Sequence, residues 1–372
     1  MANANKPKLI RFAMLGGFLG AGKTTALAEL ARRCIARNQR VAIITNDQAD
    51  GLADTQSLAA GGFPVAEVAG ACFCCRFDAL QERIESLAAS EKPDVIFAEP
   101  VGSCTDLVAT VAQPLKQILG QRLLVAPFIV TVKPSLARVV LLGAPTGFSK
   151  NVLYIFHKQL EEADALYVSR ADGLSMAQRD DLRDRLSKRC PAREIIFGSA
   201  VTGEGFADLL RVFESDLHAA RRLLDIDYDV YAEGEAELGW LNMSARLDTS
   251  QPVDMDSTVC SLLRAIGDGA SAQEGSVAHI KVAASSNQAY SVGSVVETKA
   301  EPVLAMRAHC LATSLRLTVN ARVALDPSAL QRVVEESMRA VAGAVGARFE
   351  VVEQRSLRPG RPVPIHRYSD AV

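Results

Sequence analysis

Through the first half of the chain, short apolar runs alternate with longer segments in which apolar positions recur at helical spacing. This alternation predicts an α/β fold, in which a parallel sheet carries helices on both faces. The predicted strands are 9–15, 41–45, 95–98, 128–132, 165–168 and 194–197. The predicted helices are 24–37, 79–88, 107–119, 151–162, 175–187 and 206–219.

The order of the predicted elements changes after residue 237. A strand and a helix are followed by three strands, a second helix and a last strand, which is close to a small α+β domain of the split βαβ, ferredoxin-like type. Asp326-Pro327 marks the start of the second helix, since proline suits the first helical position. The predicted elements are 238–247, 255–266, 278–284, 289–296, 315–324, 327–345 and 349–355.

Two segments without strong periodicity divide the chain. Residues 225–237 are acidic and contain few strongly apolar positions, so we expect a solvated linker there, with a cation site as the alternative reading of its carboxylates. Residues 358–372 are rich in proline and predict an extended tail. The expected domains are therefore 1–224 and 238–357, joined by the linker 225–237 and followed by the tail 358–372.

Composition narrows the classes of function. The chain has 372 residues, 49% of them hydrophobic, which is enough for two cores, and a formal net charge of −2. Without a basic surplus, nucleic acid is not expected as a partner. The first eight residues lack the apolar core of a signal peptide, and the apolar run 123–132 is too short to span a bilayer. We therefore expect a cytoplasmic protein without a membrane partner.

A glycine-rich loop lies between the first predicted strand and the helix that follows it. The sequence at 17–24 is Gly-Phe-Leu-Gly-Ala-Gly-Lys-Thr, the pattern of a phosphate-binding P-loop, so the parallel sheet is expected to be that of a doubly wound P-loop NTPase. In such a loop the backbone N–H groups surround phosphate oxygens, the lysine adds a charge, and the threonine offers a hydroxyl to Mg²⁺. The expected phosphate-binding residues are Gly17, Gly20, Ala21, Gly22, Lys23, Thr24 and Thr25.

Acidic residues follow two neighbouring strands of the predicted sheet. Asp47 comes after the strand 41–45, and Glu99 comes directly after the strand 95–98. A nucleotide hydrolase needs carboxylates near Mg²⁺ and the terminal phosphate, usually at the carboxyl ends of strands. We expect Lys23, Asp47 and Glu99 to serve catalysis, Thr24 and Asp47 to bind Mg²⁺, and Gly102 to bring a backbone N–H to the phosphate.

Three cysteines gather at Cys72, Cys74 and Cys75, just before a predicted helix. Thiolates held together at a helix start suit soft or borderline metals such as Zn²⁺, Co²⁺ or Cu⁺. Three protein thiolates leave one coordination position open, which fits metal transfer better than a closed structural site. Two alternatives are that the cysteines are small buried residues or that they form a redox pair.

Taken together, these motifs resemble the CobW-like family of P-loop GTPases, which act as metallochaperones or as activators of metal- and corrinoid-dependent enzymes. The resemblance rests on four stretches: Gly-Gly-Phe-Leu-Gly-Ala-Gly-Lys-Thr-Thr at 16–25, Thr-Asn-Asp-Gln at 45–48, Gly-Ala-Cys-Phe-Cys-Cys at 70–75 and Ala-Glu-Pro-Val-Gly at 98–102. It implies that the three cysteines bind Zn²⁺ or Co²⁺ under the control of GTP and Mg²⁺. It also implies a client metalloenzyme or corrinoid protein, and a nucleotide-dependent homodimer is a further expectation.

The chain departs from the family pattern at the guanine-binding motif. Where relatives carry Asn-Lys-x-Asp, it has Ser-Arg-Ala-Asp at 169–172. The resemblance implies that Asp172 reads the guanine, that Arg170 covers the base in place of lysine, and that Ser199 and Ala200 cover the base edge. Without the asparagine the loop loses support, so a preference for GTP over ATP is expected without being fixed by the motif.

Other departures concern the client. Only five histidines are present, and they form no tract of the kind that stores metal in many relatives.

The leading hypothesis is a metallochaperone that couples GTP hydrolysis to metal delivery. The alternatives are a GTP-dependent activator that remodels a metal or corrinoid enzyme without transferring metal, and an adaptor that binds no nucleotide.

Overall fold

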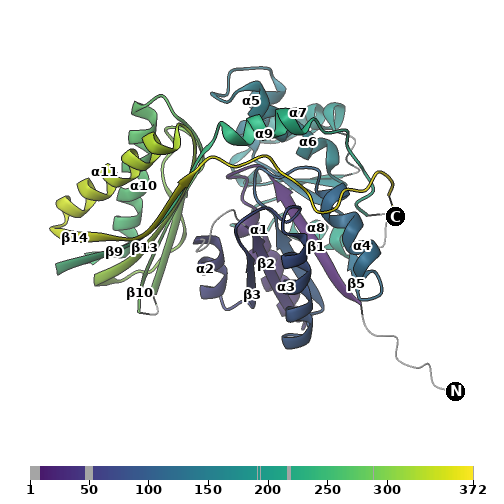
Figure 1. Cartoon of the computed structure of the whole chain (residues 1–372), viewed down its shortest axis with the longest axis horizontal. Helices are drawn as coiled ribbons and strands as arrows, with labels where there is room; N and C mark the ends of the chain where they lie inside the picture. The colour runs from purple at the N-terminus through teal and green to yellow at the C-terminus, as the bar shows by residue number, and fades with distance from the viewer. Residues whose placement is uncertain are drawn as a thin grey trace.

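The computed structural model describes residues 9–46, 53–190, 192, 194–215, 219–287 and 289–371. Its first half is built on a parallel sheet in the order β3-β2-β4-β1-β6-β7-β8, with β5 beside β1 (Figure 1). The strands are β1 Ile10–Gly17, β2 Val41–Asn46, β3 Val65–Val68, β4 Val95–Glu99, β5 Leu123–Val125, β6 Ile129–Val132, β7 Ala165–Val168 and β8 Glu194–Phe197.

Helices cover both faces of this sheet. Successive residues of β1 enter two different buried clusters, Phe12 and Met14 on one face and Ala13 and Leu15 on the other. This alternation confirms the predicted α/β class, because both faces of the strand need apolar cover. The helices are α1 Lys23–Ala36, α2 Ala53–Ala60, α3 Phe77–Ser90, α4 Gln113–Leu119, α5 Pro134–Leu141, α6 Lys150–Glu162, α7 Met176–Arg189, α8 Phe206–Glu214 and α9 Tyr228–Ala236, with a π-helix at Val108–Ala112 and a 3₁₀ turn at Ala171–Gly173.

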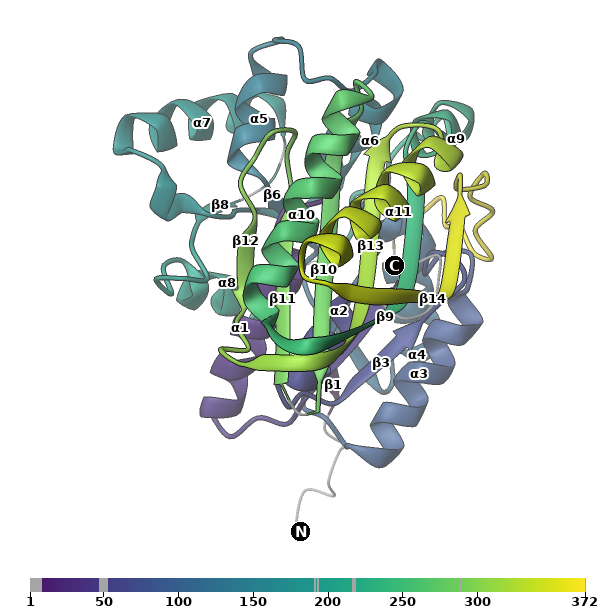
Figure 2. The same cartoon turned by 90° about the vertical axis from the view of Figure 1, so that its left-hand side faces the viewer.

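The second half forms an antiparallel sheet in the order β12-β11-β10-β13-β9-β14. The unit β9-α10-β10 straddles β13, and this arrangement is the split βαβ topology that the sequence predicts. Helices α10 and α11 cover the outer face, while the inner face is turned toward the first half of the chain (Figures 1 and 2). The elements are β9 Gly239–Asp254, α10 Met255–Ala272, β10 Ser276–Ser286, β11 Ala289–Val295, β12 Val303–Met306, β13 Leu311–Ala324, α11 Pro327–Ala344 and β14 Ala347–Leu357.

The acidic stretch between the halves corrects the expectation of a solvated linker. Most of it is helix α9, which packs against α6 and is capped by Asp227, whose carboxylate accepts from two backbone N–H groups. Gly234 lies so close to α6 that a Cβ would approach the carbonyl oxygen of Asn151 to 2.4 Å. Tyr231 and Glu235 are buried, whereas Asp229 points to solvent. Most of this acidic stretch is therefore a packed helix with acids on both its exposed and its buried side, which a count of charges misses.

Residues 358–371 contain no helix or strand, and they run from β14 back across the first half of the chain (yellow in Figure 1). Within the described residues, no helix combines the length and the apolar character needed to span a membrane.

Candidate functional site

The phosphate loop joins β1 to α1 through backbone shapes that require glycine. Gly17 has φ 128°, and a Cβ there would lie 2.2 Å from the carbonyl oxygen of Thr131. Gly22 has φ 95° and precedes the first residue of α1. The loop therefore ends at a helix N-terminus, whose free N–H groups and dipole favour an anion.

The polar groups expected around Mg²⁺ and phosphate meet beside this helix start. Lys23 is buried, and its Nζ donates to the carbonyl oxygen of Gly17 at 3.0 Å and lies 3.9 Å from Glu99 Oε1. The hydroxyl of Thr24 donates to the same carboxylate oxygen at 3.1 Å. Hydroxyl and carboxylate oxygens are ligands that Mg²⁺ accepts, so these residues fit the ion. Asp47, the other expected Mg²⁺ ligand, lies outside the described residues.

The loop after β4 touches the phosphate loop directly. A Cβ on Gly102 would lie 3.0 Å from Lys23 Nζ and 2.9 Å from Leu19 Cδ2. Only glycine fits here without a shift, and its backbone lies where the sequence expects a phosphate contact. Glu99 and Gly102, which lie at the two ends of one short segment, are thus both close to Lys23.

The predicted base-binding residues lie on the other side of the loop. The Ser169 hydroxyl donates to the carbonyl oxygen of Ala21 at 2.7 Å, so a serine does tie this segment to the phosphate loop. Arg170 has φ 52°, and its guanidinium donates to the carbonyl oxygen of Gly20 at 3.1 Å. Asp172 sits in the 3₁₀ turn that follows. The Ser199 hydroxyl accepts from the N–H of Val201 at 3.2 Å and so shapes its own turn.

These residues line one cavity of about 870 Å³, which is large enough for a nucleotide. Among the predicted residues, Gly17 and Ala21 support the loop from behind without lining the cavity. Those that line it are Gly20, Gly22, Lys23, Thr24, Thr25, Glu99, Gly102, Arg170, Asp172, Ser199 and Ala200.

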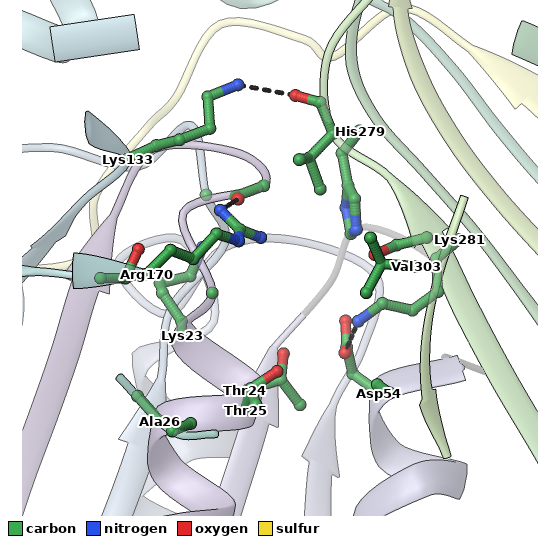
Figure 3. Close-up of a pocket in the computed structure, with 18 of the residues that line it drawn as sticks. Lys23, Thr24, Thr25, Ala26, Asp54, Lys133, Arg170, His279, Lys281 and Val303 are labelled. Atoms are coloured by element: carbon green, nitrogen blue, oxygen red, sulfur yellow. Dashed lines mark hydrogen bonds and ion pairs between the residues drawn. The ribbon is translucent and has the colours of Figure 1, made fainter. Parts of the chain in front are cut away.

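The inner face of the second sheet closes the same cavity, which the sequence did not predict. His279 and Lys281 approach from β10, opposite Arg170, Lys133 and Lys23 (Figure 3). Burial, followed by the charges of Lys23, Arg322, Arg170 and Lys133, lowers the pKa of His279 to about 3. Cations from both halves of the chain therefore surround a space suited to an anion.

Contacts between the halves hold this arrangement in place. Lys133 Nζ donates to the carbonyl oxygen of Val296 at 2.6 Å, and Lys281 forms an ion pair with Asp54 of α2. The side-chain oxygen of Asn320 accepts from the N–H of Ala53 at 2.9 Å. No local sequence signal could have found these residues, because the two sheets meet only in the tertiary structure.

The three clustered cysteines form a second site. Their sulfur atoms all lie within 4.8 Å of one another, with Cys72 to Cys74 at 2.9 Å and Cys72 to Cys75 at 3.1 Å. Cys72 and Cys74 are buried, Cys75 is half-buried, and none is in a disulfide. Such a group of thiols can hold a soft or borderline metal ion.

The protonation of this cluster is uneven. Hydrogen bonding within the group holds the pKa of the Cys72 thiol well below its ordinary value. The hydrogen bond with Cys72 raises the pKa of Cys75 to about 11, and the hydrogen bonds with Cys72 and Cys75, followed by burial, raise the pKa of Cys74. Among the three thiols, the environment of Cys72 therefore favours the thiolate most.

Asn46, the last residue of β2, holds the cysteine loop. Its amide nitrogen donates to the carbonyl oxygens of Val68 and Ala71, each at 2.8 Å, and its oxygen accepts from the N–H of Phe73 at 2.9 Å. The sequence places Asn46 in a family motif, but its function as a tether required the structure. It joins the end of a strand near the phosphate loop to the loop that carries the cysteines.

The C-terminal tail crosses the cysteine loop. The N–H of Val363 donates to Cys75 Sγ at 3.3 Å, and the N–H of Ile365 donates to the carbonyl oxygen of Cys74 at 2.9 Å. Arg367 anchors the tail through Asp106 Oδ2 at 2.7 Å and the carbonyl oxygen of Leu224 at 2.8 Å. The thiols are thus covered by a segment almost 300 positions away along the chain (|i−j| 288).

Comparison with known families decides the identity of this arrangement. The family model described as the CobW/HypB/UreG nucleotide-binding domain matches residues 11–197, which include the phosphate loop, the cysteines and the segment 169–172 that is predicted to bind the base. The chain belongs to the CobW/HypB/UreG family. The second sheet lies outside the matched residues, so the part of the cavity that His279 and Lys281 line is not covered by the family model.

Individual relatives are more distant. The zinc chaperone YeiR of Escherichia coli (strain K12) is 29% identical over 171 residues, which are 44% of this chain and 47% of YeiR, so the chain spans about half the length of this curated relative. HypB from Helicobacter pylori in complex with nickel is 18% identical with a TM-score of 0.39 and covers 55% of this chain and 85% of its own. The Zn(II)-bound YjiA GTPase from E. coli is 16% identical with a TM-score of 0.33 and covers 91% and 99%.

Proposed function

We propose that this protein is a GTP-hydrolysing metallochaperone that carries Zn²⁺ or Co²⁺ on Cys72, Cys74 and Cys75 to a client metalloenzyme in the cytoplasm. The observation that carries the proposal is the cluster of three free thiols, tied by Asn46 to the strand edge beside the phosphate loop. Among the two metals we favour Zn²⁺, because the curated relative is a zinc chaperone.

The residues of the cavity support nucleotide hydrolysis. Lys23 and the N-terminus of α1 would neutralise phosphate charge, and Thr24 with Glu99 would hold Mg²⁺, which supplies further charge stabilisation. Asp172 would select guanine, and Arg170, fixed on the loop by its bond to Gly20, would cover the base. Asp47 completes the proposed Mg²⁺ ligands, as the sequence predicts.

Coupling between the two sites follows from shared segments. Glu99 and Gly102 contact Lys23, and the same loop continues to residues buried beside the cysteines. A change at the phosphate site that moves this loop would therefore be felt at the thiols. The client receives the metal when that change loosens the hold of the protein on it.

The test compares the wild type with a variant in which Cys72, Cys74 and Cys75 are all serine. We expect the wild type to bind one Zn²⁺ in competition with a chromogenic chelator, and its GTP hydrolysis to change when metal is bound. The variant should bind GTP normally but lose the metal and its effect on hydrolysis. Retention of metal affinity by the triple variant would sink the proposal.

The same measurements separate the proposal from its alternatives. A remodelling activator would hydrolyse GTP faster with its client and hold no exchangeable metal at the cysteines. An adaptor with a vestigial site would give no heat when titrated with GTP. Either outcome would contradict metal delivery driven by GTP.

A further inference from the structure

A bulge in β10 turns two consecutive residues toward the first half of the chain. The pairing of β10 with β13 shifts register between Val277 and His279, so Ala278 is an extra residue in the strand. Val277 and Ile280 both pack in the core under α10 and α11, which leaves Ala278 and His279 on the inner face. Without the bulge, strict alternation would turn His279 into that apolar core.

The bulged residue packs directly against the phosphate loop. A Cβ on Gly20 would lie 2.9 Å from the carbonyl oxygen of Ala278 and 2.9 Å from the Cβ of Val296, which follows β11. Ala278 also shares a buried cluster with Leu19 of the same loop. Lys133, directly after β6, donates to the carbonyl oxygen of Val296. The start of β10 is therefore fixed against the loop that is expected to hold the phosphates.

His279 follows the bulged residue, and its ring points into the nucleotide cavity (Figure 3). Two cations on the same sheet already have partners within the protein. Lys281 pairs with Asp54, and Arg322 donates to the side-chain oxygen of Asn242 at 2.8 Å. Within the described part of the chain, no residue forms a hydrogen bond with the His279 ring. On this wall of the cavity, the ring is therefore available to a bound molecule.

The ring of His279 suits a hydrogen bond to an anion. Burial, followed by the neighbouring cations, lowers its pKa to about 3, so the ring is neutral at about pH 7. A neutral imidazole still carries one N–H, which can donate. Lys23 lines the same cavity, and the lysine of a P-loop reaches the β- and γ-phosphates. Phosphates in this cavity can therefore be contacted from both halves of the chain.

We propose that His279 is a nucleotide-binding residue whose ring N–H donates to an oxygen of the β- or γ-phosphate. This inference rests on the proposed function as a GTPase. It assigns a contact with the nucleotide to the half of the chain that the family model does not match. The ring binds and orients the phosphates, and the second sheet becomes part of the nucleotide site.

The first test compares affinities for a GTP analogue that is not hydrolysed and for GMP, measured on the full chain by competition with fluorescent GDP. His279→Ala should lose at least about tenfold in affinity for the analogue, because a hydrogen bond to a charged oxygen is lost. It should lose little for GMP, which lacks both outer phosphates. His279→Gln, whose amide can also donate, should recover most of the loss.

His309→Ala is the matched control for the affinities. His309 is 76% exposed and is not among the residues that line the cavity, so this variant should bind both nucleotides like the wild type. Equal affinities of the wild type and His279→Ala for the analogue would overturn the inference. An equal loss for GMP would also overturn it, because the contact would then be with the base, the ribose or the α-phosphate.

The second test observes the ring in the wild type. The five histidines are labelled with ¹⁵N, and the ring signal that is absent from His279→Gln identifies His279. This signal should shift when the GTP analogue binds and much less when GMP binds. An unchanged ring signal would overturn the inference. Because the shift is measured on the wild type, it decides the matter even if His279→Ala does not fold.

Failure of this inference is distinct from failure of the proposed function. If the wild type binds the GTP analogue and His279→Ala binds it equally well, the GTPase proposal stands and the contact with His279 is refuted. If the wild type does not bind the GTP analogue, the proposed function itself is wrong.

Discussion

The phosphate loop and the cysteine loop are built in opposite ways. The phosphate loop is a run of consecutive residues whose working groups are mainly backbone N–H groups at the start of α1. The cysteine loop works through side chains, and its position depends on Asn46 and on the tail at Val363 and Ile365. A site made from local backbone is robust to distant changes, whereas a site assembled by remote contacts can be controlled through any of them.

The largest expected effect tests how local the phosphate site is. In Lys23→Ala, GTP hydrolysis should fall by at least about 100-fold, because a buried charge aimed at the phosphates is lost. Zn²⁺ affinity without nucleotide should change little, since the bonds described for the cysteine loop come from Asn46 and the tail. Steady-state kinetics measures GTP hydrolysis and chelator competition measures Zn²⁺ affinity. Lys188→Ala, which changes an exposed lysine, is the control. A large loss of metal affinity in Lys23→Ala would contradict the separation of the sites.

The next effect tests the remote support of the cysteine loop. Asn46→Ala removes three hydrogen bonds, so we expect the free energy of unfolding to fall by about 2–3 kcal/mol and Zn²⁺ affinity by about tenfold. Urea unfolding and chelator competition provide the values. Asn151→Ala, which loses one exposed bond to Glu233, should change neither by a comparable amount. Unchanged metal affinity in Asn46→Ala would mean that the loop keeps its shape unaided.

A smaller effect concerns the tail. In Arg367→Ala the tail loses its ion pair with the buried Asp106 and its bond to Leu224, which should lower the unfolding free energy by about 1–2 kcal/mol. Release of bound Zn²⁺ to a chelator should become faster because Val363 and Ile365 are held less firmly over the thiols. Stopped-flow metal release measures this, and Arg339→Ala on α11, which loses only an exposed pair with Glu335, is the control. Equal release rates would show that the cover plays no part in exchange.

The smallest effect tests whether the second sheet takes part in the phosphate site. The folded pKa of His279, about 3, lies below its ordinary value of 6.5, so its contribution to stability is complete above pH 6.5 and declines as the pH falls toward 3. Between pH 8 and pH 6 the wild type should lose about 0.8 kcal/mol through this group. His279→Gln should not show this loss. Urea unfolding at the two pH values decides it; identical slopes in wild type and His279→Gln would show that the pKa of His279 is not lowered in the folded protein.

The sequence alone determined the features that neighbouring residues create. The hydrophobic pattern defined both sheets. A strand that is buried on both faces gives a continuous apolar run, whereas a strand that is buried on one face gives alternating apolar and polar residues. The phosphate loop was found at Gly17 to Thr24, since one consecutive segment makes it, and the cysteines stood out through their close spacing. In each case, residues that are close along the chain are also close in the folded protein.

Only the tertiary structure decided how distant segments meet. It packed most of the acidic stretch 225–237 into helix α9, placed His279 and Lys281 in the nucleotide cavity, and laid Val363 across Cys75. Hydrogen bonds and charges act over a few ångströms regardless of sequence distance, so these contacts follow from how the elements pack and leave no local pattern to read.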